Sequence, residues 1–143
     1  MPMPLLRILL VDDDDIVREA IEMRLAREDG LQTVGSVATG EEAILAAHRL
    51  NPDLIILDLG LPSLSGMDTM RSIIEAHPRV RIVVLSAKQS PELVQQAFDS
   101  GAAAYVFKPS AGIDLLDAVQ AVIAGHRYAS AAVCGLSSPA AAT

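Results

Sequence analysis

The feature that most constrains the fold of this chain is an alternation of five short apolar runs with longer segments of helical periodicity. The runs cover residues 8–11, 33–38, 54–57, 82–85 and 104–107, and all except the second are almost continuously apolar. Strands buried on both faces are typical of parallel sheets covered by helices. The sequence therefore predicts an α/β protein with a doubly wound, five-stranded parallel sheet and five helices.

Several residues mark where the helices begin. Thr39 and Glu42 form a capping-box pattern, and Ser90 precedes a proline at a favourable first helical position. Asp14 or Asp15 is expected to cap the first helix, because a carboxylate accepts hydrogen bonds from free N–H groups there. Helices consequently follow the apolar runs at the spacing that a parallel sheet requires.

Composition restricts the classes of function. The 143 residues are 51% hydrophobic, which suffices for the core of one domain. A net charge of -7 argues against direct contact with nucleic acid by this chain. The run 8–11 is too short to span a membrane and is followed by four aspartates, so no membrane contact is expected. The single cysteine, Cys134, excludes an internal disulfide and is typical of a cytoplasmic protein.

Polar side chains of distinct chemistry follow four of the five apolar runs: Asp12 and Asp13, then Asp58, Ser86 and Lys108. Because the carboxyl ends of parallel strands meet at one edge of a sheet, we expect these side chains to converge. Clustered carboxylates repel one another unless a cation is bound or a proton is shared, and oxygen ligands suit Mg²⁺. A nearby lysine and hydroxyl would then contact a transferred phosphoryl group.

With these residues in this order, the chain resembles the response-regulator receiver domain, the phosphoacceptor module of two-component signalling, over residues 6–127. The resemblance implies a flavodoxin-like fold with Asp58 as the phosphoacceptor. It also implies that Mg²⁺ is held by Asp12, Asp13, Asp58 and the backbone carbonyl of Gly60. Many relatives carry a side chain that shields or steers water at the position of Gly60, so water access is expected to set the lifetime of the phosphorylated state here.

The same resemblance implies a switch controlled by phosphorylation. Lys108 would pair with the phosphoryl oxygens, Ser86 would hydrogen-bond one of them, and Tyr105 would turn inward. The surface around the fourth helix and fifth strand would change and control a transcription-regulating output. A sensor histidine kinase or phosphotransfer protein is the expected partner, and a homodimer is a second expected assembly. The chain is not expected to be an enzyme beyond Mg²⁺-dependent self-phosphorylation from small donors and self-dephosphorylation.

The C-terminal part bears on the output. Residues 121–128 resemble the end of receivers that precede a LuxR-type helix-turn-helix domain, so we expect a receiver domain over 1–128. Residues 129–143 contain no charged side chain and are rich in Ala and Ser, which predicts a flexible tail or linker. Two arrangements stay open: the N-terminal part of a transcription regulator, or a stand-alone receiver that acts by protein contacts.

Two other classes of function are alternatives. A phosphatase of the haloacid-dehalogenase type would use an Asp-x-Asp pattern such as Asp12 and Asp14, but it would need a cap insertion, and no loop is long enough. A degenerate receiver would bind partners without being phosphorylated. The complete set of acidic, hydroxyl and lysine positions argues against that alternative.

Overall fold

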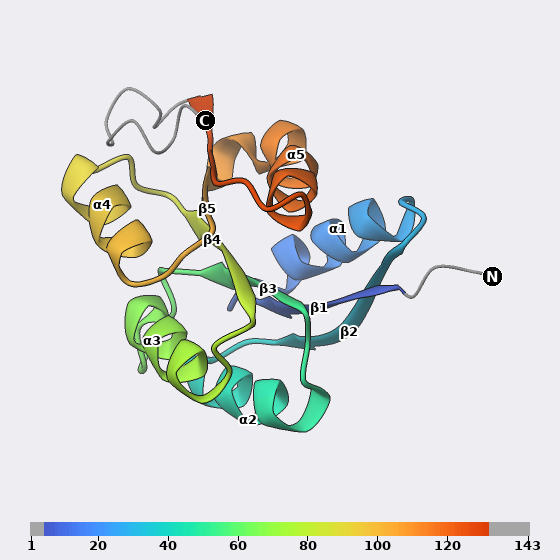
Figure 1. Ribbon diagram of the computed structural model, residues 1–143, viewed down its shortest axis with the longest axis horizontal. Helices are drawn as coiled ribbons and strands as arrows, with labels where there is room; N and C mark the ends of the chain where they lie inside the picture. Colours follow the sequence, from blue (N-terminus) through green and yellow to red (C-terminus); the bar gives the residue numbers. More distant parts are fainter. Residues whose placement is uncertain (1–4, 132–143) are drawn as a thin grey trace.

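The computed structural model describes residues 5–131, which form a six-stranded parallel sheet with helices on both faces (Figure 1). The strands are β1 (Leu6–Val11), β2 (Leu31–Val37), β3 (Leu54–Asp58), β4 (Arg81–Ser86), β5 (Ala104–Phe107) and β6 (Tyr128–Ala129). The helices are α1 (Asp15–Ala26), α2 (Gly40–Leu50), α3 (Gly66–Ala76), α4 (Pro91–Asp99) and α5 (Ala111–Ile123), with a 3-10 turn, η1 (Lys108–Ser110), before α5. The predicted doubly wound sheet with five helices is confirmed.

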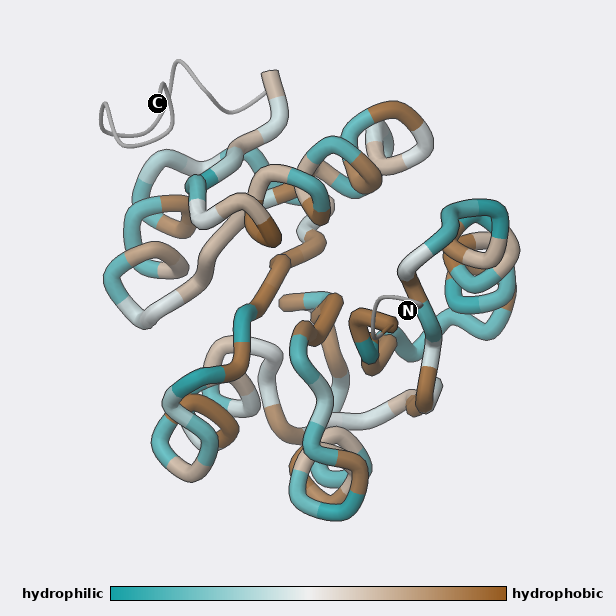
Figure 2. Tube along the Cα trace, turned by 45° about the vertical axis from the view of Figure 1, so that its right-hand side comes forward, coloured by the Kyte–Doolittle hydropathy of each residue, from teal (hydrophilic) through white to brown (hydrophobic). Residues whose placement is uncertain are grey.

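The sheet separates two apolar cores. Helices α2, α3 and α4 cover one face, where Ala43, Met70 and Phe98 pack against the strands. Helices α1 and α5 cover the other face through residues such as Leu25 and Val119. In Figure 2 the central strands are mostly hydrophobic, while the helices alternate hydrophobic and hydrophilic residues around each turn. The apolar runs thus form strands because both of their faces are covered.

The predicted helix starts are confirmed. The Thr39 hydroxyl accepts a hydrogen bond from the backbone N–H of Glu42 at 3.1 Å, which completes the predicted cap of α2. The Ser90 hydroxyl accepts one from Leu93 N–H at 3.3 Å at the start of α4. Of the two candidate caps for α1, Asp14 is the one whose side chain accepts hydrogen bonds from the first turn. Each cap fixes the chain direction just after a strand end.

The short strand β6 was not predicted. It runs parallel to β5, and the pairing continues beyond it because Ser130 N–H donates to the carbonyl of Tyr105 at 3.0 Å. A two-residue strand is too short to show a periodic pattern, so the sequence does not distinguish it from a linker. The tail predicted for 129–143 therefore begins inside the sheet, with Ala129 and Ser130 buried. Residues 132–143 lie outside the part that the structure describes.

The strand order is β2-β1-β3-β4-β5-β6, so the direction of winding reverses between β1 and β3. Helix α1 leaves β1 on one face of the sheet, and α2 enters β3 from the other face. Such a reversal opens a crevice at the carboxyl ends of the two strands, where ligands bind in sheets of this kind. Within residues 5–131, no helix combines the length and the apolar character that a membrane span requires.

Candidate functional site

Three carboxylates meet at the reversal point. Asp12 follows β1 and is 1% exposed, and Asp58 ends β3 and is 4% exposed, whereas Asp13 is exposed to solvent. One carboxylate oxygen from each residue lies within 4.8 Å of those of the other two. The predicted convergence of these side chains is therefore observed.

Each buried carboxylate is oriented by a backbone N–H two residues further along the chain. Asp14 N–H donates to Asp12 Oδ1 at 2.9 Å, and Gly60 N–H donates to Asp58 Oδ1 at 2.8 Å. These are Asx-type turns, which an aspartate at a strand end favours. Burial raises the pKa of Asp12, and the Lys108 ammonium and the Asp14 N–H offset this effect only in part.

Lys108 lies between the two buried carboxylates. Its Nζ atom is 3.1 Å from Asp58 Oδ2 and 2.8 Å from Asp12 Oδ2, a contact that the sequence did not predict. Burial lowers the pKa of Lys108, but its contacts with Asp12 and Asp58 raise it by more, so the ammonium stays charged at neutral pH. The Asp12 contact is an ion pair, and apart from it the buried Oδ2 atom has no hydrogen-bond partner among the described residues.

These contacts leave the site with an excess of negative charge. Three carboxylates share one ammonium, which contacts Asp12 and Asp58, and within residues 5–131 the buried Oδ2 of Asp12 has no partner besides this ammonium. The donor set consists of hard oxygen atoms, and one of the three side chains is open to solvent. The residues present therefore fit a hydrated divalent cation such as Mg²⁺.

Ser86 and Tyr105 are connected through the loop between β4 and α4. Ser86 is buried, and its hydroxyl accepts a hydrogen bond from Lys88 N–H at 3.1 Å. Tyr105 is fully buried, and its hydroxyl donates to the carbonyl of Lys88 at 2.9 Å. Burial raises the pKa of Tyr105 more than the neighbouring Ser86 hydroxyl lowers it. Tyr105 thus already points inward in this structure. Its hydroxyl and that of Ser86 both bind the backbone of Lys88, in the loop between β4 and α4.

A cavity of about 450 Å³ adjoins these groups and contains most of the predicted site. Its lining includes five of the predicted residues: Asp13, Asp58, Gly60, Ser86 and Lys108. It also includes residues that the sequence did not single out, among them Leu93 and Gln96 of α4. The sequence pattern of α4 does not predict that Gln96 lines the cavity, because the position of α4 near the carboxyl ends of β3 and β4 depends on tertiary packing. The cavity therefore links the carboxylates directly to α4.

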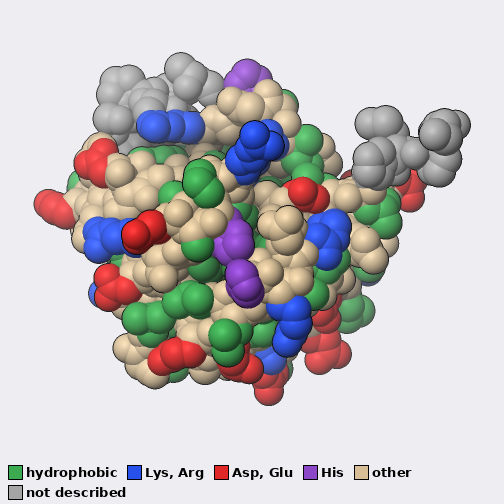
Figure 3. All heavy atoms as spheres, turned by 60° about the horizontal axis from the view of Figure 1, so that its bottom comes forward, with side chains coloured by type: hydrophobic (Ala, Val, Ile, Leu, Met, Phe, Trp, Pro, Cys, Tyr) green, Lys and Arg blue, Asp and Glu red, His purple; other side chains and the backbone are tan. Residues whose placement is uncertain are grey.

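Other candidate groups do not form comparable sites. Asp14, the second acid of the phosphatase alternative, caps α1 instead of facing a substrate beside Asp12. Two histidine side chains gather on the face shown in Figure 3, and the ring centroids of His48 and His77 lie 6.2 Å apart. No third ligand joins them, because Asp12, Asp13 and Asp58 are the only group of three such side chains within the described residues. The carboxylate site is therefore the best-formed candidate.

Comparisons with known proteins agree with one another on the family. A family model for the response regulator receiver domain matches residues 8–120. Response regulator GacA of Pseudomonas viridiflava is 34% identical over 126 residues, which cover 88% of this chain and 59% of that protein. Response regulator protein VraR of Staphylococcus epidermidis is 33% identical over 121 residues, covering 85% and 58%. The chain thus spans about three fifths of the length of these curated relatives.

A solved structure gives the same result for the fold. The crystal structure of a LuxR-family two-component response regulator from Aurantimonas sp. SI85-9A1 is 33% identical to this chain, with a TM-score of 0.87. The match covers 92% of this chain and 94% of that one. Sequence and structure comparisons therefore point to the same group of proteins.

Proposed function

The chain belongs to the response regulator receiver domain family, and from this premise we propose that it accepts a phosphoryl group on Asp58 in a Mg²⁺-dependent reaction. The observation that carries the proposal is the position of Lys108, whose ammonium contacts both Asp58 and Asp12 at the carboxyl edge of the sheet. An acceptor carboxylate, a fixed positive charge and a surplus of oxygen ligands are the groups that phosphoryl transfer requires.

The proposed chemistry follows from the orientation of Asp58. Gly60 N–H holds Oδ1, so the carboxylate presents a fixed face to the cavity. A carboxylate oxygen of Asp58 forms a bond to phosphorus while the bond from phosphorus to the donor breaks, and the electron pair of that bond leaves with the donor group. When the donor is a phosphohistidine of a sensor kinase or phosphotransfer protein, the leaving group is its imidazole.

Charge neutralisation would come from two sources. Asp12, Asp13, Asp58 and the Gly60 carbonyl would hold Mg²⁺, which supplies positive charge to the phosphoryl oxygens. Lys108 would move its ammonium from the carboxylate pair towards the same oxygens. Since its pKa is raised, Lys108 carries its charge throughout the physiological pH range.

Phosphorylation would be transmitted through the β4–α4 loop. A phosphoryl group adds negative charge and acceptor oxygens at Asp58, which would draw the Ser86 hydroxyl away from Lys88. Tyr105 also binds Lys88, so a displaced loop changes the packing between α4 and β5. The surface around α4 and β5 is therefore the proposed switch region, by a shift between two packed states.

The output is proposed from the relatives. Because the chain spans about three fifths of GacA and VraR and is similar to a LuxR-family response regulator, we propose that it is the receiver part of a transcription regulator with a separate DNA-binding domain. In that arrangement the receiver domain, predicted over residues 1–128, would also include Ala129 and Ser130, which are buried against the sheet. The remaining residues up to 143 would form the linker to that domain. As a separate proposal, phosphorylation would be accompanied by the formation of a homodimer.

The proposal is tested by the intact mass of the protein after incubation with Mg²⁺ and acetyl phosphate. We expect the gain of one phosphoryl group, and none when Mg²⁺ is removed by a chelator. Mg²⁺ alone is expected to raise the Tm, because a cation relieves the repulsion among the carboxylates and binds only the folded state. A protein that neither binds Mg²⁺ nor gains a phosphoryl group from acetyl phosphate or from phosphorylated kinases would instead be a degenerate receiver.

Gly60 is predicted to set the lifetime of the phosphorylated state. A Cβ added there would lie 3.4 Å from Asp58 Oδ1, which is ordinary van der Waals contact, so a side chain can be accommodated. Gly60→Arg is expected to slow hydrolysis about three- to tenfold by excluding water from the phosphoryl group. Decay of the phosphorylated mass after donor removal measures this rate. Gly112→Arg, in α5, is the matched control, and equal decay for all three proteins would refute the prediction.

A further inference from the structure

Ser130 occupies a particular place at the end of the sheet. It is fully buried, and its backbone N–H donates to the carbonyl of Tyr105 at 3.0 Å. Its hydroxyl accepts a hydrogen bond from the N–H of Phe107 at 2.9 Å. The Ser130 hydroxyl thus replaces a backbone carbonyl as the acceptor just after β6 ends. Through it, the hydrogen bonds along this edge of β5 continue to Phe107, the last residue of the strand.

Phe107 immediately precedes Lys108, and serine hydroxyls bind both of its backbone polar groups. Ser130 binds its N–H, and Ser110, at the end of η1, donates to its carbonyl at 3.2 Å. That carbonyl belongs to the peptide that joins Phe107 to Lys108. The backbone from which the Lys108 side chain extends is therefore fixed from two sides.

The Lys108 side chain spans two carboxylates at 2.8 and 3.1 Å, so a small shift of its backbone changes both distances. An alanine at position 130 would leave the N–H of Phe107 without its acceptor, and the surrounding burial limits replacement by water. The end of β5 would then relax, although the carboxylates on β1 and β3 would stay in place.

We propose that Ser130 is a positioning residue for Lys108, so that the docking of residues 128–130 on β5 sets how fast Asp58 accepts a phosphoryl group. The proposal rests on the proposed function of Asp58. It connects residues 128–130 to the phosphorylation site through Phe107, although these residues lie beyond residues 8–120, which the family match covers. Because Phe107 directly precedes Lys108, a phosphoryl group that draws Lys108 would also change how firmly Ser130 holds the end of β5.

The test compares Ser130→Ala with the wild-type chain in phosphorylation by acetyl phosphate, at a temperature where thermal unfolding shows both to be folded. We expect the rate at saturating donor to fall about five- to tenfold, since small misplacements of a catalytic group have large effects. Mg²⁺ affinity is expected to change less than twofold, because the carboxylates keep their positions. Ser130→Thr, which retains the hydroxyl, should recover part of the rate, and Ser72→Ala on the exposed face of α3 serves as the control.

An unchanged saturating rate for Ser130→Ala would overturn the proposal, as would equal losses of rate and Mg²⁺ affinity, which indicate general loosening. Amide hydrogen exchange of the wild-type protein gives a second measurement that does not depend on any variant. Phosphorylation should change the protection of the Phe107 and Ser130 amides, and equal protection in both states would also overturn it. If the wild-type chain gains no phosphoryl group from acetyl phosphate or from phosphorylated kinases and does not bind Mg²⁺, the proposed function fails. In that case, slow amide hydrogen exchange at Phe107 in the wild type and fast exchange in Ser130→Ala would still show that the Ser130 hydroxyl binds the Phe107 N–H.

Discussion

Asp58→Asn is expected to abolish phosphorylation of this protein while leaving it folded. An asparagine amide is not a nucleophile towards phosphorus, but its carbonyl oxygen can still accept the hydrogen bond that Gly60 N–H donates. Asp58 is one of the groups that raise the pKa of Asp12, so its removal relieves repulsion between buried carboxylates. The expected Tm without Mg²⁺ is therefore equal to or above that of the wild type, whereas the increase produced by Mg²⁺ is smaller.

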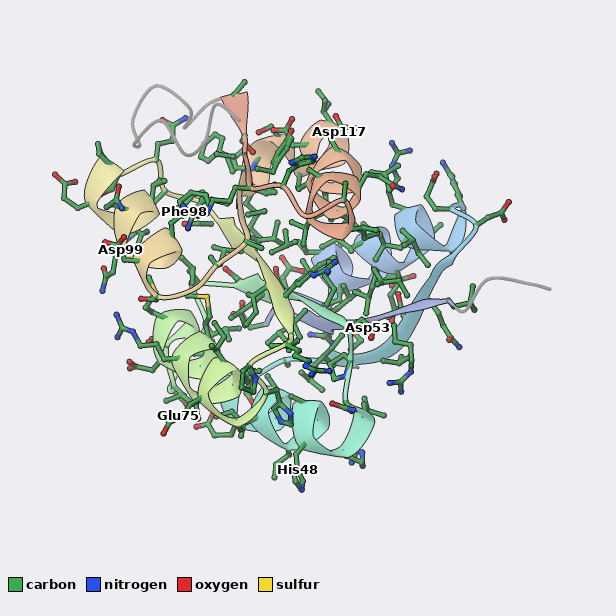
Figure 4. All side chains as sticks on the ribbon, viewed as in Figure 1. His48, Asp53, Glu75, Phe98, Asp99 and Asp117 are labelled. Atoms are coloured by element: carbon green, nitrogen blue, oxygen red, sulfur yellow. The ribbon has the colours of Figure 1, made fainter. Side chains whose placement is uncertain are left out.

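Intact mass and thermal unfolding, each with and without Mg²⁺, measure these effects. Asp53→Asn is the matched control. Asp53, labelled in Figure 4, lies directly before β3, whereas Asp58 is the last residue of that strand. The Asp53 carboxylate accepts a hydrogen bond from Arg7 N–H at 2.9 Å, which asparagine can also accept. A phosphoryl group found on Asp58→Asn would place the acceptor elsewhere and refute the assignment.

Gly66→Ala is expected to lower the free energy of unfolding by about 2–4 kcal/mol. A Cβ at Gly66 would lie 2.4 Å from the Cα of Leu59 and 2.5 Å from the carbonyl oxygen of Asp58. Both are backbone atoms, so neither can turn away as a flexible side chain would. The turn after β3 must shift instead, and we expect slower phosphorylation together with the loss of stability.

Urea unfolding measures the stability of this variant, and Gly112→Ala provides a control of opposite sign. No atom lies within 4 Å of a Cβ added at Gly112, which is in α5. Alanine is the better helix former, so Gly112→Ala should stabilise the protein by about 0.5–1 kcal/mol. If Gly66→Ala left both the stability and the phosphorylation rate unchanged, the close approach of α3 to the turn after β3 would not constrain the site.

The main groups of the site could be predicted from sequence because each of them ends or directly follows a buried strand. Asp12, Asp58, Ser86 and Lys108 are separated by long segments, but parallel pairing brings the carboxyl ends of their strands to one edge. The parallel pairing itself was predicted from apolar runs without polar alternation. Local pattern and topology were therefore enough to predict the convergence.

Other contacts could not be predicted because they depend on distances between packed elements. The ion pair between Lys108 and Asp12 is an example, since strand order alone does not specify which carboxylate a long side chain reaches first. The place of Gln96 in the cavity depends on how α4 packs on the sheet. Ser130 lies in a segment whose composition is typical of a linker, and only its pairing with β5 distinguishes it from one.

The sixth strand also determines which edge of the sheet is available to other molecules. Residues 128–130 pair with β5 and so occupy hydrogen-bonding groups that would otherwise face solvent. An unpaired strand edge is a template on which another chain can add its own strand. A shorter chain that ended at residue 127 would expose this edge along β5, so shortening this receiver at residue 127 would favour aggregation through edge-to-edge pairing.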